Sequence, residues 1–221
     1  FSIMFNINPE IKKSPTLPSE FYREEKYFEQ SKEKIFSKTW QFIGDTDLVK
    51  VPGQVHPFTL LDGFMNEPLL LTRDYEDNIN CISNICTHRA NIICEGSENV
   101  KSLRCRYHGR QFELTGKFKF MPEFEQCENF PSERDNLPIV DFKIFNNLIF
   151  TSLNPSSPFD EFFKEIKERL HWFPFDKLIL DVFRSKDYLV KAHWALYCEN
   201  YLEGFHIPYI HKSLNDALDY A

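Results

Sequence analysis

The spacing of hydrophobic and polar residues changes along this 221-residue chain. Residues 19–37 place apolar side chains on a helical stripe, with Ser19 as N-cap and acidic residues in the first turn. From Trp40 the pattern becomes short β-type runs separated by turn residues. Helical spacing returns after Asn154, with Pro158 at the first helical position and apolar residues at 159, 162, 163, 166 and 170. This order predicts an N-terminal helical arm, then a β-rich domain, and then the helical start of a second domain.

The predicted fold class is therefore α+β, with an antiparallel β-sandwich as its main body. We expect an N-terminal helical arm at residues 1–38, the β-sandwich domain at 39–153 and the start of a further domain at 154–221. Strands are expected at residues 39–44, 47–51, 56–61, 67–72, 79–86, 111–114, 117–120, 139–145 and 148–153.

Composition and charge limit the possible partners. Apolar residues make up 42% and charged residues 27%, as in an ordinary globular protein, and 23 Phe predict a Phe-rich core. A net charge of −7 without a basic stripe argues against nucleic acid. The apolar runs are too short for a membrane span, and the N-terminus has no secretory-signal pattern. We therefore expect a cytoplasmic protein that binds neither nucleic acid nor membrane.

Two loops in the β-rich part carry paired cysteines and histidines. Cys86-Thr87-His88 is followed, after sixteen residues, by Cys105-Arg106-Tyr107-His108-Gly109. Two thiolates on one iron and two imidazoles on the other are the ligands of a Rieske [2Fe-2S] cluster. A structural zinc site is the alternative, but such sites usually open with C-x2-4-C and close with H-x3-5-H. The spacing thus favours the cluster, held by Cys86, His88, Cys105 and His108.

A second group of polar residues lies near the end of the chain. Asn200, Glu203 and His206 recur every three residues, which predicts one face of a helix. His211 follows five residues later, and Pro208 is expected to end or kink the helix so that His211 turns back towards His206. Two histidines and a carboxylate form the facial triad of Fe(II) oxygenases. In isolation, such histidines are more often ordinary hydrogen-bonded polar groups than metal ligands.

Both groups resemble one protein family. Residues 86–116 resemble the Rieske domain of ring-hydroxylating and related non-haem iron oxygenases, and residues 200–211 resemble the N-x2-D/E-x2-H-x4-H signature of their helix-grip catalytic domains. The resemblance, which covers residues 19–221, implies a [2Fe-2S] cluster and a mononuclear Fe(II) held by His206 and His211. It implies that Glu203 is the catalytic carboxylate bridging to a Rieske histidine of a neighbouring subunit in a homotrimer.

The chain also departs from the family pattern. Asn91 and Tyr107 stand where respiratory Rieske proteins have additional cysteines, which indicates the oxygenase or ferredoxin kind of domain. Arg110 stands where many relatives have Trp. The family's third iron ligand is an acidic residue far downstream, so we expect residues 154–221 to be the truncated start of the helix-grip domain. Asp216 and Asp219 are weaker ligand candidates.

The resemblance implies the terminal oxygenase of a multi-component system. A reductase or ferredoxin would supply electrons, and O2 would hydroxylate a small molecule. Details of both motifs look closer to oxygenases of quaternary amines such as choline, betaine or carnitine, and Tyr201, Phe205 and Tyr209 could contact such a cation. An aromatic-ring dioxygenase of phenylpropionate type is the alternative, and a Rieske ferredoxin-like electron carrier is a third possibility. The remaining cysteines are expected to be small buried residues: Cys81, Cys94, Cys127 and Cys198.

Overall fold

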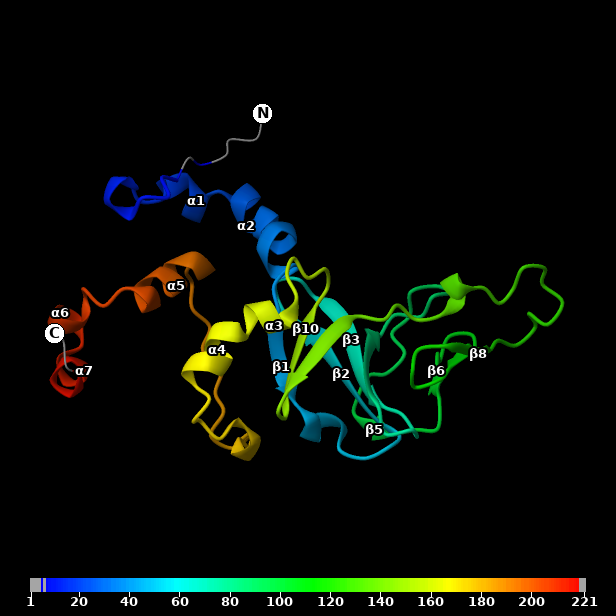
Figure 1. The fold of residues 1–221 in the computed structure, drawn as a ribbon. Coiled ribbons are helices and arrows are strands. Elements are labelled where there is room, and N and C mark those ends of the chain that lie inside the picture. The colour runs from blue at the N-terminus through cyan, green and yellow to red at the C-terminus, as the bar shows by residue number, and fades with distance from the viewer. Residues whose placement is uncertain (1–4, 6, 219–221) are drawn as a thin grey trace. The chain divides into compact units, whose positions relative to one another are not determined.

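The β-type runs form antiparallel strands in three sheets, as Figure 1 shows for this computed structural model, which describes residue 5 and residues 7–218. The sheets have the strand orders β1-β10-β9, β4-β3-β2-β5 and β6-β7-β8. This confirms the predicted antiparallel architecture. The strands are β1 (Gln41–Asp45), β2 (Gln54–Leu60), β3 (Glu67–Arg73), β4 (Ile79–Ser83), β5 (Glu98–Asn99), β6 (Leu103–Arg104), β7 (Gln111–Phe112), β8 (Phe118–Phe120), β9 (Asp141–Phe145) and β10 (Leu148–Ser152).

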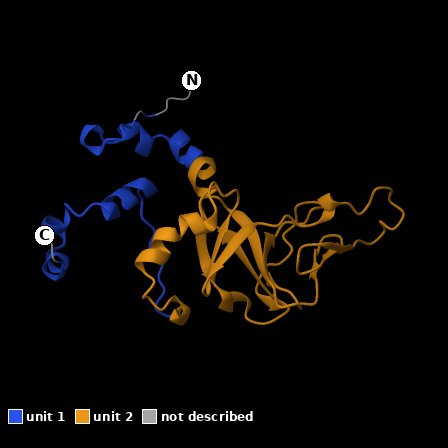
Figure 2. Ribbon diagram, viewed as in Figure 1, with its two compact units in different colours: residues 1–31, 183–221 blue, residues 32–182 orange. Residues whose placement is uncertain are grey.

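The chain divides into two units (Figure 2). One is continuous, residues 32–182, and contains all these strands. The other combines both ends of the chain, residues 1–31 and 183–221. The outer limits of the predicted domains, residues 1 and 221, lie outside the described residues. The predicted domain boundaries near residues 38 and 153 stay predictions.

Two of the elements expected before residue 52 were wrong in detail. The expected strand at 47–51 is instead a 3-10 helix, Thr46–Val49, because the Asp45 side chain accepts a hydrogen bond from the Asp47 backbone N–H at 3.0 Å and caps a helical turn. The expected helix at 19–37 is broken where Glu24 adopts an extended conformation. It becomes α1 (Ser19–Arg23), α2 (Glu25–Ser31) and a π-helical turn, Lys32–Phe36.

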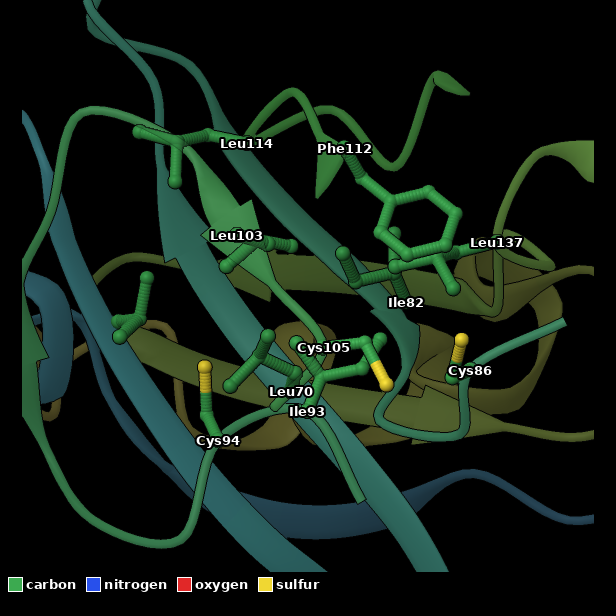
Figure 3. Close-up of a cluster of buried hydrophobic side chains, with 11 residues drawn as sticks. Leu70, Ile82, Cys86, Ile93, Cys94, Leu103, Cys105, Phe112, Leu114 and Leu137 are labelled. Carbon is green, nitrogen blue, oxygen red and sulfur yellow. The ribbon is translucent and has the colours of Figure 1, made fainter. Parts of the chain in front are cut away.

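Strand β3 forms the centre of the core because both of its faces are buried. Leu70 lies in one hydrophobic cluster, whereas Leu69 and Leu71 lie in another, since successive side chains point to opposite faces of a strand. This explains its continuous apolar run. The first cluster is drawn in Figure 3 and consists of Val55, Leu70, Ile82, Cys86, Ile93, Cys94, Leu103, Cys105, Phe112, Leu114 and Leu137.

Substitution of Leu70 by Ala should strongly destabilise this core. Leu70 is fully buried, so truncation loses its transfer free energy and leaves a cavity, which should lower the free energy of unfolding by about 2–5 kcal/mol. Urea denaturation followed by far-UV circular dichroism measures the change. Ile139→Ala is the control, because that side chain is 78% exposed and should change stability by about 0.5 kcal/mol or less. Equal losses in both variants would contradict the assigned core.

A third cluster joins the segment after residue 154 to the sheets. Trp40, Phe150, Phe159 and Phe163 are buried together, with the Phe159 and Phe163 rings stacked at 4.9 Å. The Trp40 indole N–H donates to the Ser157 carbonyl at 3.1 Å. The predicted helical segment here forms α3 (Phe159–Phe162) and α4 (Lys164–Arg169), followed by a 3-10 turn, Phe175–Lys177.

The unit made of both chain ends is helical. Besides α1 and α2 it contains α5 (Trp194–Leu202), α6 (Ile207–Ile210) and α7 (Lys212–Ala217), with a 3-10 turn at Ile11–Lys13. The Tyr22 hydroxyl donates to the Glu199 carboxylate, at 2.7 and 2.9 Å from its two oxygens. Burial, together with this acceptor, raises the pKa of Tyr22 to about 12. Among the described residues, no helix has the length and hydropathy needed to cross a bilayer.

Candidate metal centres

The first cysteine–histidine loop is closed by backbone hydrogen bonds. The Cys86 N–H donates to the Asn91 carbonyl at 2.8 Å, and the Ala90 N–H donates to the Cys86 carbonyl at 3.0 Å. Ala90 has φ of +51°, the left-handed conformation needed for so tight a turn. An isolated bridge between Ile85 and Ile92 joins the two ends of the loop.

The second loop repeats this arrangement. The Cys105 N–H donates to the Arg110 carbonyl at 2.8 Å, and the Gly109 N–H donates to the Cys105 carbonyl at 3.0 Å. Gly109 occupies the left-handed position, with φ of +72°. Strands β6 and β7 pair across its base. Each loop therefore begins with a cysteine and presents a histidine two or three residues later from an equivalent turn.

The loops bring the four predicted cluster ligands together. Cys86 and Cys105 are 2% and 1% exposed, and Figure 3 shows their sulfur atoms as neighbours in the core cluster. The His88 and His108 rings lie 4.8 Å apart between centroids. His88 is half-buried and His108 is exposed. The thiols thus face the core, and the imidazoles lie towards the surface.

The ionisation of these groups fits a bound cluster. Burial raises the pKa of the Cys86 thiol, and the neighbouring Cys105 raises it further, so the paired thiolates need positive charge from metal to form. Burial, followed by the charges of His108, Arg89 and Arg110, lowers the pKa of His88 and favours the neutral imidazole that a metal requires. Among the described residues, buried His88 Nδ1 has no hydrogen-bond partner, which a metal bond would satisfy.

Asn91 makes a contact that the sequence pattern did not reveal. Its amide Nδ2 donates to Cys105 Sγ at 3.7 Å, from one loop to the other. Hydrogen bonds to ligand sulfur stabilise negative charge there and tune an iron–sulfur cluster. Tyr107, the other replaced position, stacks on the His108 ring at 3.9 Å. The residues that replace the extra cysteines of respiratory proteins both contact expected ligands.

The other cysteines divide into two groups. Cys81 and Cys94 are buried, as expected, and burial raises the pKa of each thiol to about 11. The expectation was wrong for Cys127 and Cys198, which are exposed. Both lie in segments without a surrounding sheet, so the apolar character of the thiol alone does not bury them.

The second predicted site is built around a break between two helices. Helix α5 ends at Leu202, and Glu203 has an extended backbone. Glu203 Oε1 lies 2.5 Å from His206 Nδ1, and Oε2 accepts the Phe205 N–H at 2.6 Å. The predicted proximity of Glu203 and His206 is present, but the expected single helix was wrong because the chain turns between the two residues.

Short helix α6 brings the two histidines together. His206 and His211 flank it, and their rings are 5.2 Å apart between centroids. Pro208 lies in its first turn, where the missing N–H costs no hydrogen bond, rather than ending a longer helix. Although partial burial raises the pKa of Glu203, the bonds from His206 and the Phe205 N–H outweigh it and lower the pKa below its usual value.

A metal could use the nitrogen of His206 that faces away from Glu203. Because Nδ1 is engaged by the carboxylate, Nε2 is left for a metal, an arrangement common among metal-binding histidines. Asp216 lies exposed on α7, and Asp219 lies outside the described residues. Within the described part of the chain, no three or more His, Cys, Asp or Glu side chains form a group suited to one metal ion. Each iron of a Rieske cluster needs only two protein ligands.

Comparisons with known proteins identify a matching domain family and similar sequences. The family profile described as Rieske [2Fe-2S] domain matches residues 39–131. The chloroplastic choline monooxygenase of Amaranthus tricolor is 29% identical over 93% of this chain and 47% of its own length. The glycine betaine monooxygenase oxygenase subunit of Pseudomonas aeruginosa is 28% identical over 92% of this chain and 46% of its own.

A solved structure shows the same fold. The crystal structure of the quaternary ammonium Rieske monooxygenase CntA in complex with L-carnitine superposes with a TM-score of 0.76 at 21% identity, covering 92% of this chain and 57% of that one. The chain spans about half the length of the curated relatives it matches. Residues 39–131 thus match the Rieske [2Fe-2S] domain family, and most of the chain is similar in sequence to choline monooxygenase and to the oxygenase subunit of glycine betaine monooxygenase.

Proposed function

We propose that this chain belongs to the terminal oxygenase of a multi-component Rieske non-haem iron system. The observation that carries the proposal is the presence of two metal-ligand groups in one chain: the paired loops at Cys86 and Cys105, and the Glu203, His206 and His211 group. An electron carrier needs only the first group. The second group would supply two histidine ligands, His206 and His211, to a mononuclear iron.

The proposed roles follow from the positions of the side chains. Cys86 and Cys105 would hold one iron of the cluster in the core, and His88 and His108 would hold the other near the surface. When bound, the cluster would carry single electrons and the mononuclear iron would activate O2 for hydroxylation.

The chain's own residues prepare the mononuclear site. His206 donates its Nδ1 proton to Glu203, which fixes the ring and directs Nε2 towards a metal. The ring of His211 lies 5.2 Å from it between centroids and would be the second ligand. We propose that Glu203 also links His206 to the Rieske histidine of a neighbouring subunit in a homotrimer, with electrons supplied by a reductase or ferredoxin.

The proposed substrate is a small quaternary ammonium compound. The relatives described above are named for choline and glycine betaine, and CntA was solved with L-carnitine. Tyr201, Phe205 and Tyr209 are exposed around the second group and offer ring faces for a quaternary cation. A cytoplasmic location stays a prediction, since the Amaranthus relative is chloroplastic.

Turnover assays of the full-length protein with its reductase and NAD(P)H test the proposal. We expect O2 consumption and hydroxylated product with choline, glycine betaine or carnitine, and none with phenylpropionate. Choline and its uncharged isostere 3,3-dimethylbutanol form a matched pair, so the difference in their turnover measures how much the positive charge contributes to substrate recognition. Turnover of phenylpropionate alone would favour an aromatic-ring dioxygenase, whereas a reducible cluster without any turnover would favour an electron carrier.

A further inference from the structure

Arg110 is a buried cation next to the second cluster loop. Its side chain is only 3% exposed. The guanidinium carbon lies 5.7, 5.0 and 5.6 Å from the ring centroids of Phe112, Phe118 and Phe130. A charge in such surroundings is poorly screened by water and needs a partner.

Asp135 is that partner, and it contacts both cluster loops. Its Oδ1 accepts from Arg110 Nη2 at 2.5 Å, and its backbone carbonyl accepts from the same nitrogen at 3.2 Å. The same carbonyl accepts the hydroxyl of Thr87, between Cys86 and His88, at 2.8 Å. One residue thus joins the loop of Cys86 to the loop of Cys105.

The carboxylate of Asp135 is itself held firmly. Its Oδ2 accepts from the Ser132 N–H at 2.7 Å and from the Ser132 hydroxyl at 2.9 Å. The Arg110 carbonyl meanwhile accepts the Cys105 N–H, so a shift of Arg110 would move a ligand loop. The contacts form a continuous path from Ser132 through Asp135 to both loops.

We propose that Arg110 and Asp135 are positioning residues that hold the two ligand loops in register, and that their opposite charges set the reduction potential of the cluster. Reduction adds one electron, supplied by the external donor, and hence one negative charge to the cluster. Buried positive charge nearby stabilises the reduced form, and buried negative charge destabilises it. The inference rests on cluster binding by these loops and does not depend on the substrate.

Substitution of Arg110 and of Asp135 should shift the midpoint potential of the cluster in opposite directions. Arg110→Gln leaves an uncompensated carboxylate and should lower the midpoint potential, whereas Asp135→Asn leaves an uncompensated guanidinium and should raise it. We expect each to change the one-electron equilibrium by about tenfold or more, or ~59 mV. The double variant should return towards the wild-type value. Redox titration of the full chain, followed by visible absorption and electron paramagnetic resonance, measures these potentials.

Three variants separate charge from structure. Arg106 lies in the same loop but is 71% exposed, so Arg106→Gln should leave the potential almost unchanged. Arg110→Lys keeps the charge and should stay closer to wild type than Arg110→Gln. Thr87→Val removes only the loop contact to Asp135. It should speed loss of the cluster to a chelator but should not shift the midpoint potential as Arg110→Gln or Asp135→Asn does.

Several results would overturn the inference. These are shifts in the same direction for Arg110→Gln and Asp135→Asn, shifts no larger than that of Arg106→Gln, or unchanged cluster loss in Thr87→Val. If one single variant loses its cluster, the other still decides, because its shift has one expected direction and must exceed that of Arg106→Gln. A wild-type chain without a cluster would contradict the site assignment as well, whereas normal turnover with unchanged potentials would reject this inference alone.

Discussion

Cys86→Ala should abolish binding of the [2Fe-2S] cluster. The iron expected at Cys86 and Cys105 has only these two protein ligands, and removing one leaves it bound to a single thiolate. The lost bond cannot be replaced locally because Cys86 is buried in the core cluster. Iron and acid-labile sulfide per chain should fall to near zero, with loss of the visible absorption of the cluster.

Cys94→Ala is the matched control for this experiment. Cys94 lies in the same core cluster, but its side chain is not among the proposed ligands. Both substitutions remove one buried sulfur atom, so any general packing defect is common to them. Retention of the cluster in Cys94→Ala and its loss in Cys86→Ala support the assignment. A full cluster in Cys86→Ala would show that the ligand set is wrong.

Glu203→Gln should lower coupled turnover of the full-length oxygenase by about 10–100-fold while leaving the Rieske absorption intact. Gln keeps the shape of the side chain but loses the negative charge that holds His206 Nδ1. The link proposed between the two centres would be weakened without any change at the cluster loops. Product formation under saturating reductase, together with the cluster spectrum, measures both effects.

The control is a carboxylate of the same type with no proposed role. Glu165 forms an exposed ion pair with Arg169, four residues later on helix α4. Glu165→Gln makes the same change in charge, and turnover should stay within about twofold, since exposed pairs contribute little. A Glu203→Gln enzyme that forms product at the wild-type rate would refute the bridging role.

The strongest local patterns predicted the fold well. A strand was predicted at residues 67–72, and β3 occupies this segment; the structure adds that its Leu69–Leu71 run is buried on both faces. The spacing at Cys86 and Cys105 predicted a paired-loop site, and those loops are closed by equivalent hydrogen bonds. These features depend on residues close together in the sequence, so a short window contains the necessary information.

Features that depend on distant residues could not be predicted. Asp135 lies 25 positions beyond Arg110, and neither residue alone indicates a buried pair. The break at Glu203 was missed for a different reason: spacing of three fits a helix, while the competing Glu203–Phe205 N–H bond stabilises a turn. Sequence spacing thus identified the candidate site residues. Their conformation depends on contacts that the spacing does not contain, such as the Arg110–Asp135 pair and the Glu203–Phe205 N–H bond.

The Tyr22–Glu199 bond also restricts when the chain can fold during synthesis. These partners are 177 positions apart, and a ribosome adding 5–20 residues per second needs roughly 9–35 s between them. Residues 32–182 can fold in the meantime, because that unit is continuous. The apolar face of α1 and α2 must stay without its final partner during this delay. A nascent chain paused after residue 182 should therefore have a protease-resistant β-rich unit and a protease-sensitive N-terminal arm.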